Sequence, residues 1–227
     1  MPILTDDEIK MLINAECHDP FIYLGLRKLD EKNLIVRTIQ PFAKEAYLIT
    51  QDKKIKLDKI HPSGLFEKKI EGTEFFEYEF EYVAQDGHKW RTVDPYSFLP
   101  VISEYDRYLF NEGNHYKIYE KLGAHPMKIK GVNGVLFATW APNAKRVSVV
   151  GNFNNWDGRV HQMRVLGVSG IWEIFIPNVV EGDLYKFEIK TQNGEILLKT
   201  DPYGTYFEVR PNTAAIVYDV DDKHKWQ

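Results

Sequence analysis

Four segments in the first half of this 227-residue chain recur in the second half, in the same order. The pairs are QPFAKEAYLI (40–49) with APNAKRVSVV (141–150), GLFEKKI (64–70) with GIWEIFI (170–176), FEYEFEYVAQDG (76–87) with DLYKFEIKTQNG (183–194), and DPY at 94–96 and 201–203. The partners are 101 residues apart in the first pair, 106 in the second and 107 in the other two. Chance matches would not keep nearly one spacing over four segments. We therefore predict two copies of one fold, each of about 100 residues.

Each copy is predicted to be a β-sandwich. Short runs rich in Ile, Val, Tyr and Phe are separated by Pro, Gly, Asp and Asn in both halves, which is typical of short strands joined by turns. Over residues 76–82, Glu alternates with Phe and Tyr, so one face of that strand should be wet and the other buried. Hairpin turns are expected at Asp86-Gly87 and in the GVNGV segment at 131–135. The predicted fold class is all-β, with two tandem immunoglobulin-like β-sandwiches.

Two helical segments are predicted outside the sandwiches. Thr5 and Glu8 have the spacing of a capping box and begin a short N-terminal helix. Strand-like alternation is lost between residues 103 and 123, where NHYKIYEKLG predicts a short helix with Asn114 as N-cap and Gly123 as C-cap residue. The predicted domains are an N-terminal β-sandwich with a leading helix (1–102), a helical linker (103–123) and a second β-sandwich (124–227).

Composition argues against several classes of protein. The net charge of −4 gives no reason to expect a nucleic-acid partner. Cys17 is the only cysteine, so no disulfide framework is possible and a small core residue is expected. No run approaches the roughly 20 apolar residues of a membrane span, and no signal peptide is recognised, so we predict no membrane partner and a cytoplasmic location. The seven histidines lack metal-ligand spacing, and we predict no metal and no cofactor.

The second half resembles a known family. The segments VSVVGNFNNWDGR, GIWEIFIP, LYKFEI and KTDPY resemble a carbohydrate-binding module of family 48. With YEKLGAHP and VRPNTAAIVYD added, nearly the whole chain is similar to the N-terminal region of bacterial 1,4-α-glucan (glycogen) branching enzymes. The resemblance implies a non-catalytic region that positions α-1,4-glucan, as glycogen or maltooligosaccharides, and supports a downstream catalytic barrel.

The same resemblance implies where the chemistry occurs. Branching enzymes transfer α-1,4-glucan segments to α-1,6 branch points, which requires two carboxylates about 5 Å apart. The family carries these carboxylates in the barrel, downstream of residue 227. We therefore expect no catalytic residue in this chain and no activity of the chain alone. Two alternatives stay open: a stand-alone glucan-binding or scaffold protein without enzymatic activity, and a different amylase-type enzyme, such as a debranching enzyme.

The candidate binding site lies at the tip of a loop. Trp156 follows an apolar run, at a point where the chain should leave the sheet and face solvent. The repeat spacing increases from 101 to 106 between the first two pairs, so about five extra residues of the second copy are placed in the interval that contains Trp156. An exposed Trp can stack on the apolar face of a sugar while nearby amides and charges bind its hydroxyls. Asn154, Asn155 and Lys186 are the candidates for those groups. The resemblance implies that Trp156 stacks on glucose and that Lys186 hydrogen-bonds it.

Two binding positions of the family are not matched. Ile196 or Leu197 stands where glycan-binding relatives carry a second Trp, and Ala214 stands where they carry an Asn. The alternative for Trp156 is packing against the barrel or the first sandwich.

The other tryptophans have different predicted places. Trp90, in the first copy, is a possible second aromatic surface. We expect Trp140 and Trp172 to be core residues, and Trp226 to mark the start of the link to the barrel.

Overall fold

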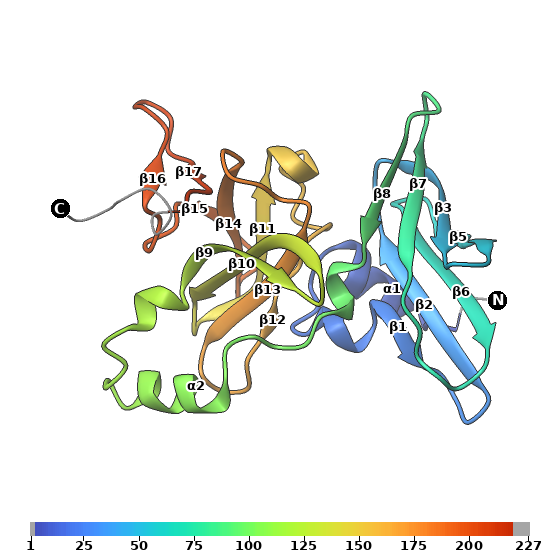
Figure 1. Ribbon diagram of the computed structural model, residues 1–227, viewed down its shortest axis with the longest axis horizontal. Coiled ribbons are helices and arrows are strands. Elements are labelled where there is room, and N and C mark those ends of the chain that lie inside the picture. Colours follow the sequence, from blue (N-terminus) through green and yellow to red (C-terminus); the bar gives the residue numbers. More distant parts are fainter. Residues whose placement is uncertain (1–2, 220–227) are drawn as a thin grey trace. The chain divides into compact units, whose positions relative to one another are not determined.

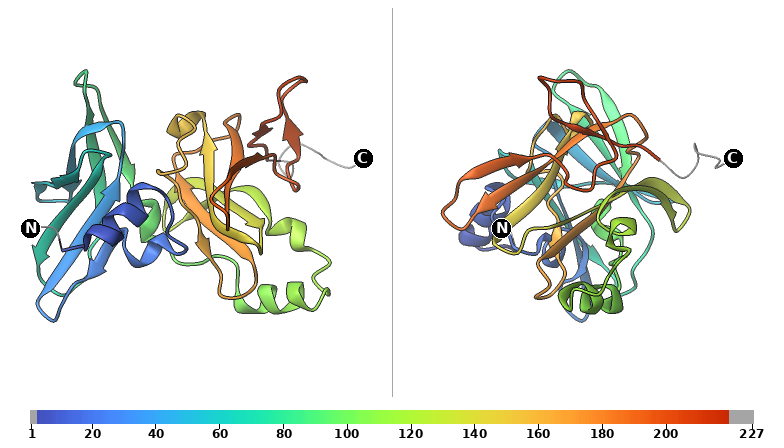
Figure 2. Two further views of the ribbon diagram at one scale, coloured as in Figure 1. Left: turned by 180° about the vertical axis from the view of Figure 1, so that it is seen from behind. Right: turned by 90° about the vertical axis from the view of Figure 1, so that its left-hand side faces the viewer.

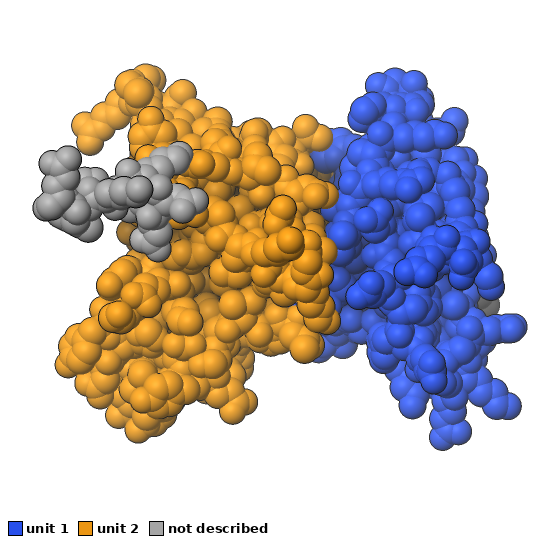
Figure 3. Space-filling model, viewed as in Figure 1, with its two compact units in different colours: residues 1–98 blue, residues 99–227 orange. Residues whose placement is uncertain are grey.

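The protein contains two compact β-rich units. A computed structural model describes residues 3–219 and divides the chain into unit 1 (Met1–Phe98) and unit 2 (Leu99–Gln227), which are blue and orange in Figure 3. Each unit contains two antiparallel sheets and, within the described residues, one α-helix. The predicted all-β fold of two tandem sandwiches is confirmed.

Unit 1 is a sandwich of two four-stranded sheets, ordered β1-β2-β6-β5 and β4-β3-β7-β8 (Figure 1). Its core contains Leu34 and Val36 from the first sheet and Leu48 and Phe80 from the second. The elements are α1 (Asp6–Ile13), η1 (Pro20–Ile22), β1 (Gly25–Lys28), β2 (Asn33–Ile39), β3 (Ala43–Ile49), β4 (Lys54–Lys56), β5 (Asp58–His61), β6 (Leu65–Glu71), β7 (Glu79–Ala84), β8 (Lys89–Val93) and η2 (Pro95–Ser97).

Helix α1 begins with the predicted capping box. The Thr5 hydroxyl accepts a hydrogen bond from the Glu8 N–H (3.3 Å), and the Glu8 carboxylate accepts one from the Thr5 N–H (2.8 Å). Ile9 and Leu12 form the buried face of the helix. Cys17 is buried as predicted, and burial raises the pKa of its thiol to about 11, which opposes thiolate reactivity.

Unit 2 has the same plan. One sheet is ordered β12-β13-β10-β9; in the other, β14 pairs with β11, β15 and β17, and β17 pairs with β16 (Figure 2). The elements are α2 (Glu104–Asn111), η3 (Ile118–Glu120), β9 (Gly123–Ile129), β10 (Val132–Trp140), β11 (Ala144–Gly151), η4 (Asn152–Asn154), β12 (Arg164–Val165), β13 (Ile171–Pro177), β14 (Leu184–Thr191), β15 (Ile196–Lys199), β16 (Tyr206–Phe207) and β17 (Ala215–Ile216).

Strand pairing supports the predicted repeat. The order β1-β2-β6-β5 in unit 1 corresponds to β9-β10-β13-β12 in unit 2, and β3-β7-β8 corresponds to β11-β14-β15. The register shifts at the same point in both copies, between Ala43 and Glu45 and between Ala144 and Arg146. A corresponding order of seven strands and an identical irregularity indicate two copies of one fold rather than two unrelated sandwiches.

The repeat extends into the segment that the sequence predicts to be a linker. Helix α2 follows α1 at a spacing of 98 residues, as η3 follows η1 and β9 follows β1. Ser103 and Asp106 form a capping box, like Thr5 and Glu8. The unit boundary falls between Phe98 and Leu99, so residues 103–123 lie inside unit 2. We call residues 99–123 the leading segment of unit 2.

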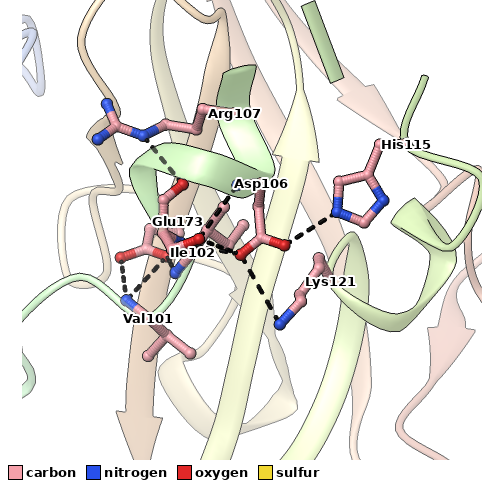
Figure 4. A network of polar contacts seen from close by, with 8 residues as sticks. Val101, Ile102, Asp106, Arg107, His115, Lys121 and Glu173 are labelled. Carbon is pink, nitrogen blue, oxygen red and sulfur yellow. Dashed lines mark hydrogen bonds and ion pairs between the residues drawn. The ribbon is translucent and has the colours of Figure 1, made fainter. Parts of the chain in front are cut away.

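Polar contacts attach this leading segment to the sandwich of unit 2 and hold the segment together (Figure 4). The buried Glu173 carboxylate accepts hydrogen bonds from the N–H groups of Val101 and Ile102, each at 3.0 Å. Asp106 lies 2.9 Å from His115 and 3.8 Å from Lys121. Although partial burial acts to raise the pKa of Asp106, hydrogen bonds from Ser103 and His115 lower it to about 2, so this carboxylate stays charged near neutral pH.

The second predicted helix differs from the observed structure. Only one 3₁₀ turn forms, Ile118–Glu120 with Lys117 as N-cap residue, and Gly123 begins β9 instead of ending a helix. Gly123 has φ +114°, a conformation that favours glycine.

The tryptophans separate into core and surface. Trp172 is buried, as predicted. The prediction for Trp140 is wrong: its side chain is 52% exposed. It ends β10, where its ring packs against Phe110 and its indole N–H donates to the Ser169 carbonyl (3.3 Å), so the alternation of the strand does not bury it. Trp226 lies outside the described residues.

Candidate glucan-binding site

The candidate loop begins where β11 ends. Gly151 lies so close to β14 that a Cβ there would stand 2.2 Å from the Leu184 carbonyl oxygen, so glycine is required. After η4, Asn155 and Trp156 both have positive φ, +53° and +58°. The Trp156 N–H donates to the Gly151 carbonyl (2.9 Å), which closes the loop against the strand end. Two successive left-handed residues are costly for non-glycine side chains and turn the chain sharply after Asn154.

Asn154 holds this loop from inside. Its side-chain oxygen accepts from the Gly151 N–H (2.9 Å), and its Nδ2 donates to the Val149 carbonyl (2.8 Å) and lies 3.0 Å from Nδ1 of His161. Asn154 is buried, so its amide is occupied by the loop and does not face solvent. This placement differs from the predicted role as a direct sugar contact and makes Asn154 a positioning residue.

His161 completes the internal support of the loop. Its ring lies 5.7 Å from the ring of Phe153, and burial lowers the pKa of its imidazole to about 3. Since Asn154 Nδ2 can only donate, the neutral imidazole accepts at Nδ1. A neutral, partly buried histidine therefore contacts Nδ2 of Asn154, while the Gly151 N–H binds the Asn154 side-chain oxygen.

Asn155 and Trp156 form the outer tip. Asn155 is exposed and the Trp156 side chain is 40% exposed. The tip therefore presents an aromatic ring and a free-standing amide side by side, the two group types that recognise a sugar face and its hydroxyls.

Lys186 reaches the same end of the sheet from the neighbouring strand. It pairs with Val150, the residue before Gly151. Its ammonium group donates to the Thr213 hydroxyl (2.7 Å), which the sequence analysis did not single out. Asn152 links the loop to β14, because its side-chain oxygen accepts from the Leu184 N–H (3.0 Å) and its Nδ2 donates to Asp183 (2.9 Å). The structure thus brings Trp156, Asn155 and Lys186 to one end of one sheet.

A buried ion pair supports the loop from below. Arg146 is buried and contacts Glu188 at 2.8 Å, and the Ser148 hydroxyl donates to the Gly158 carbonyl (2.6 Å). A Cβ at Gly158 would stand 2.0 Å from the Glu188 carboxylate. The returning half of the loop therefore packs directly on the charged face of β11 and β14.

Strand register decides which of Ile196 and Leu197 lies at the first unmatched position. Ile196 pairs with Lys190 and Leu198 pairs with Glu188, whereas Leu197 pairs with Ile189. Because alternate residues of a strand share a face, Ile196 and Leu198 lie on the face of Lys186 and Leu197 does not. Both are exposed, so they extend this face with aliphatic surface where relatives are expected to carry an aromatic ring. Ala214 is buried and presents nothing to a ligand.

The corresponding face of unit 1 is different. It contains ion pairs of Lys56 with Glu45 and of Lys54 and Arg91 with Glu81. Trp90 pairs with the buried Tyr82, packs against its ring at 5.4 Å and adjoins the core of unit 1. The predicted second aromatic surface thus differs from the structure, because Trp90 lies half-buried on the inner side.

Other kinds of site were also considered for residues 3–219. No group of three or more His, Cys, Asp or Glu side chains there could hold a metal ion. Within the same range, every helix is too short or too polar to cross a membrane.

Comparison with protein families gives two matches. Residues 5–96 match the N-terminal domain of the alpha-1,4-glucan branching enzyme GlgB, and residues 121–204 match carbohydrate-binding module 48, the isoamylase N-terminal domain. The second match contains Trp156, Asn155 and Lys186.

Individual relatives align over nearly the whole chain. The 1,4-alpha-glucan branching enzyme GlgB of Methylobacillus flagellatus is 48% identical over 223 residues, which cover 98% of this chain and 30% of the relative. The GlgB protein of Cellvibrio japonicus is 44% identical, over 99% of this chain and 31% of the relative. The chain thus spans less than a third of either protein. Among solved structures, type I pullulanase from Bacillus subtilis complexed with maltose is 19% identical with a TM-score of 0.40, over 89% of this chain and 27% of that one.

Proposed function

Because this chain belongs to the family of GlgB 1,4-alpha-glucan branching enzymes, of which it is the N-terminal region, we propose that unit 2 binds α-1,4-glucan at the Trp156 loop. Trp156 stacks on the apolar face of a glucose unit, while Asn155 and Lys186 bind its hydroxyls. The observation that supports this most directly is the exposed indole at a loop tip whose backbone is fixed by the buried Asn154 amide. A preorganised aromatic ring loses little entropy when a ligand binds.

In the whole protein, this site positions glucan for the transfer of α-1,4-linked segments to α-1,6 branch points. The transfer itself belongs to the part of the family protein outside the region matched here, and the chain alone is inactive. The match of residues 5–96 to the GlgB N-terminal domain favours a branching enzyme over a stand-alone scaffold or a debranching enzyme. We place this function in the cytoplasm, in keeping with a single, buried, free cysteine.

Replacing Trp156 tests the binding site. Only one aromatic ring meets the glucan, so we expect a dissociation constant for maltoheptaose of about 0.1 to 10 mM, or roughly 3 to 5.5 kcal/mol. Trp156→Ala should weaken binding about tenfold, measured by NMR titration of backbone amides. Trp140→Phe is the matched control, since Trp140 is also an exposed tryptophan of unit 2, and it should leave the titration unchanged. Equal affinities of wild type and Trp156→Ala would move the binding role to another surface.

Activity of the chain alone is tested separately. We expect no change in the iodine spectrum of amylose incubated with the 227-residue chain, because the carboxylate pair for glycosyl transfer is assigned to another part of the family protein. Branching by the chain alone would contradict this assignment. It would not affect the binding proposal, which the titration of Trp156→Ala tests.

A further inference from the structure

Strand β15 is an open edge of the sheet that carries Lys186 (Figure 1). Within residues 3–219, β15 pairs with β14 and with no other strand. Its apolar side chains, Ile196, Leu197 and Leu198, are 50%, 37% and 54% exposed, so the sandwich covers neither face of this strand. An exposed apolar edge strand is a template for pairing with another chain, against which natural proteins normally protect themselves.

The backbone groups of Ile196 and Leu198 point to this open edge. The Thr191 N–H donates to the Glu195 carbonyl (2.9 Å), which makes these two residues a hydrogen-bonded pair of the β14–β15 hairpin. Bonded and non-bonded pairs alternate along an antiparallel ladder, so Leu197 is the next residue that bonds to β14. The N–H and C=O groups of Ile196 and Leu198, on either side of it, therefore face away from β14.

The sequence of this edge is complementary to itself. When two β15 strands are paired antiparallel about Leu197, Ile196 of one protomer lies opposite Leu198 of its partner, and Glu195 lies opposite Lys199. The first pair exchanges both of its N–H···O bonds through the groups that face the edge. The second pair places opposite charges directly across the two strands, which stabilises a sheet. The same contacts form a second time on the other side of Leu197.

Both charged side chains are available for this contact. Glu195 and Lys199 are exposed, and within the described part of the chain neither of them forms an ion pair. A pairing shifted by two residues would place Glu195 opposite Leu197 and lose the charge match. The charges thus select the register in which every apolar side chain of the edge meets another one.

We propose that two copies of this chain associate through β15 in an antiparallel, two-fold symmetric contact. The two sheets then form one continuous sheet, with β15 of one protomer beside β15 of its partner. Such a contact requires one patch that is complementary to itself, which the run from Glu195 to Lys199 supplies. A single short strand buries less area than a standard interface, so the dimer is weak and should be half dissociated at about 0.1 mM.

The dimer aligns the candidate glucan sites of the two protomers. Opposed residues of an antiparallel pair project from the same face of the sheet, so Ile196 and Leu198 of both protomers share one face. Lys186 lies on that face in each protomer. A branched polymer can therefore bind both sites at once, which raises its apparent affinity without a new contact. This consequence rests on the proposed function, whereas the dimer itself does not.

Charge reversal tests the dimer. Sedimentation equilibrium of the 227-residue chain from about 10 μM to about 1 mM should show a rise from monomer to dimer. Glu195→Lys alone and Lys199→Glu alone should each weaken dimerisation at least tenfold, because like charges then face each other. An equimolar mixture of the two variants should associate as the wild type does, because each mixed pair again has opposite charges. Val168→Lys, at an exposed position of unit 2 outside β15, is the matched control and should leave dimerisation unchanged.

Hydrogen exchange gives a second readout at the edge itself. The amide protons of Ile196 and Leu198 should exchange at least threefold more slowly at about 1 mM than at about 10 μM. A wild-type chain that stays monomeric, single variants that dimerise like wild type, or a mixture that does not associate overturns the β15 contact. Equally slow exchange at both concentrations also overturns it, since the edge would then be covered within one chain.

Binding to glycogen tests the alignment of the two sites. At about 1 mM the wild-type chain should be retained on glycogen at least threefold more strongly than Glu195→Lys, while both bind maltoheptaose equally. Equal retention would contradict the alignment. Absence of maltoheptaose binding by both chains would contradict the proposed function and would leave the dimer, as measured by sedimentation, unaffected.

Discussion

Asp94 and Asp201 are equivalent carboxylates of the two copies, and each is buried beside a tyrosine hydroxyl. Tyr78 donates to Asp94, and Tyr185 donates to Asp201 at 2.5 Å. Each carboxylate also accepts from a backbone N–H two residues further on, at Tyr96 (2.9 Å) and at Tyr203 (2.8 Å). This double role explains why the aspartate of DPY is present in both copies. Burial raises the pKa of both carboxyl groups, to about 6 for Asp94, although the hydrogen bonds act to lower it.

Asp94→Asn should change the pH dependence of stability. A carboxyl group whose pKa is raised on folding stabilises most below its unfolded pKa of 3.8, and this contribution is lost as the pH rises through about 6. The amide does not titrate, and because Tyr78 and Tyr96 donate to different oxygens of Asp94, the loss of one acceptor oxygen lowers stability by an amount that does not depend on pH. The free energy of unfolding of the variant should therefore increase relative to wild type by about 2.4 kcal/mol between pH 4 and pH 7, measured by urea unfolding of unit 1 followed by Trp90 fluorescence. A constant difference would contradict the shift; Asp201→Asn should change in the same direction in unit 2.

At the scale of elements, strands could be predicted from sequence because alternation of side chains directly reflects burial on a sheet face. The α1 capping box is confirmed because it depends on local spacing, and the strand pairing supports the repeat because matching segments recur in one order along the chain. Trp140 could not be placed, because a ring at a strand end is exposed or covered according to its tertiary neighbours. Asn154 and Asn155 look equivalent in sequence, and only the left-handed turn after Asn154 sends one amide inward and the other outward.

The leading segment of unit 2 could not be recognised as part of the second copy from sequence. Its helix matches α1 in position and capping, but not in side chains, since α1 buries Ile9 and Leu12 whereas α2 has no buried residue. The segment is held by long-range contacts to the Glu173 carboxylate, and periodicity cannot show a hydrogen bond between residues 71 or 72 positions apart. Glu173 also pairs with the buried Arg164 (2.9 Å), so one carboxylate fixes two elements.

Glu173→Gln should therefore loosen the attachment of the leading segment. The amide has one acceptor oxygen in place of two, and its NH₂ group faces donors, so Arg164 loses its charge partner inside the protein. Removing one partner of a buried ion pair costs about 3 kcal/mol or more. The free energy of unfolding of unit 2, measured with urea, should therefore fall by about this amount. Glu104→Gln is the control: Glu104 lies in the same segment, but its side chain is 96% exposed, and its loss should cost less than about 0.5 kcal/mol. Equal stabilities of the two variants would show that Glu173 is not an anchor.

At the scale of the whole molecule, the repeat defines what must be kept together. Each copy consists of a capped helix, a 3₁₀ turn and a sandwich. Glu67 is the equivalent of Glu173 in unit 1, and its carboxylate likewise accepts a hydrogen bond from the start of its own unit, from the Ile3 N–H (3.0 Å). A division at residue 123 or 124, as sequence alternation suggests, would separate the second sandwich from its leading segment. Division at residue 98 or 99 keeps both copies complete.

Fragments cut at these two places should behave differently. Residues 99–227 retain Ile102 and Leu122, which belong to the same buried cluster as Ala138, Leu166 and Ile171, whereas residues 124–227 expose that cluster and leave Glu173 without the Val101 and Ile102 donors. Loss of two large buried aliphatic side chains alone costs about 4 kcal/mol or more, a large fraction of the stability of a domain. We expect fragment 99–227 to unfold cooperatively on heating, with dispersed NMR amide signals, and fragment 124–227 to lose both properties. Equal thermal midpoints would instead make residues 99–123 a true linker and the second sandwich self-sufficient from residue 124.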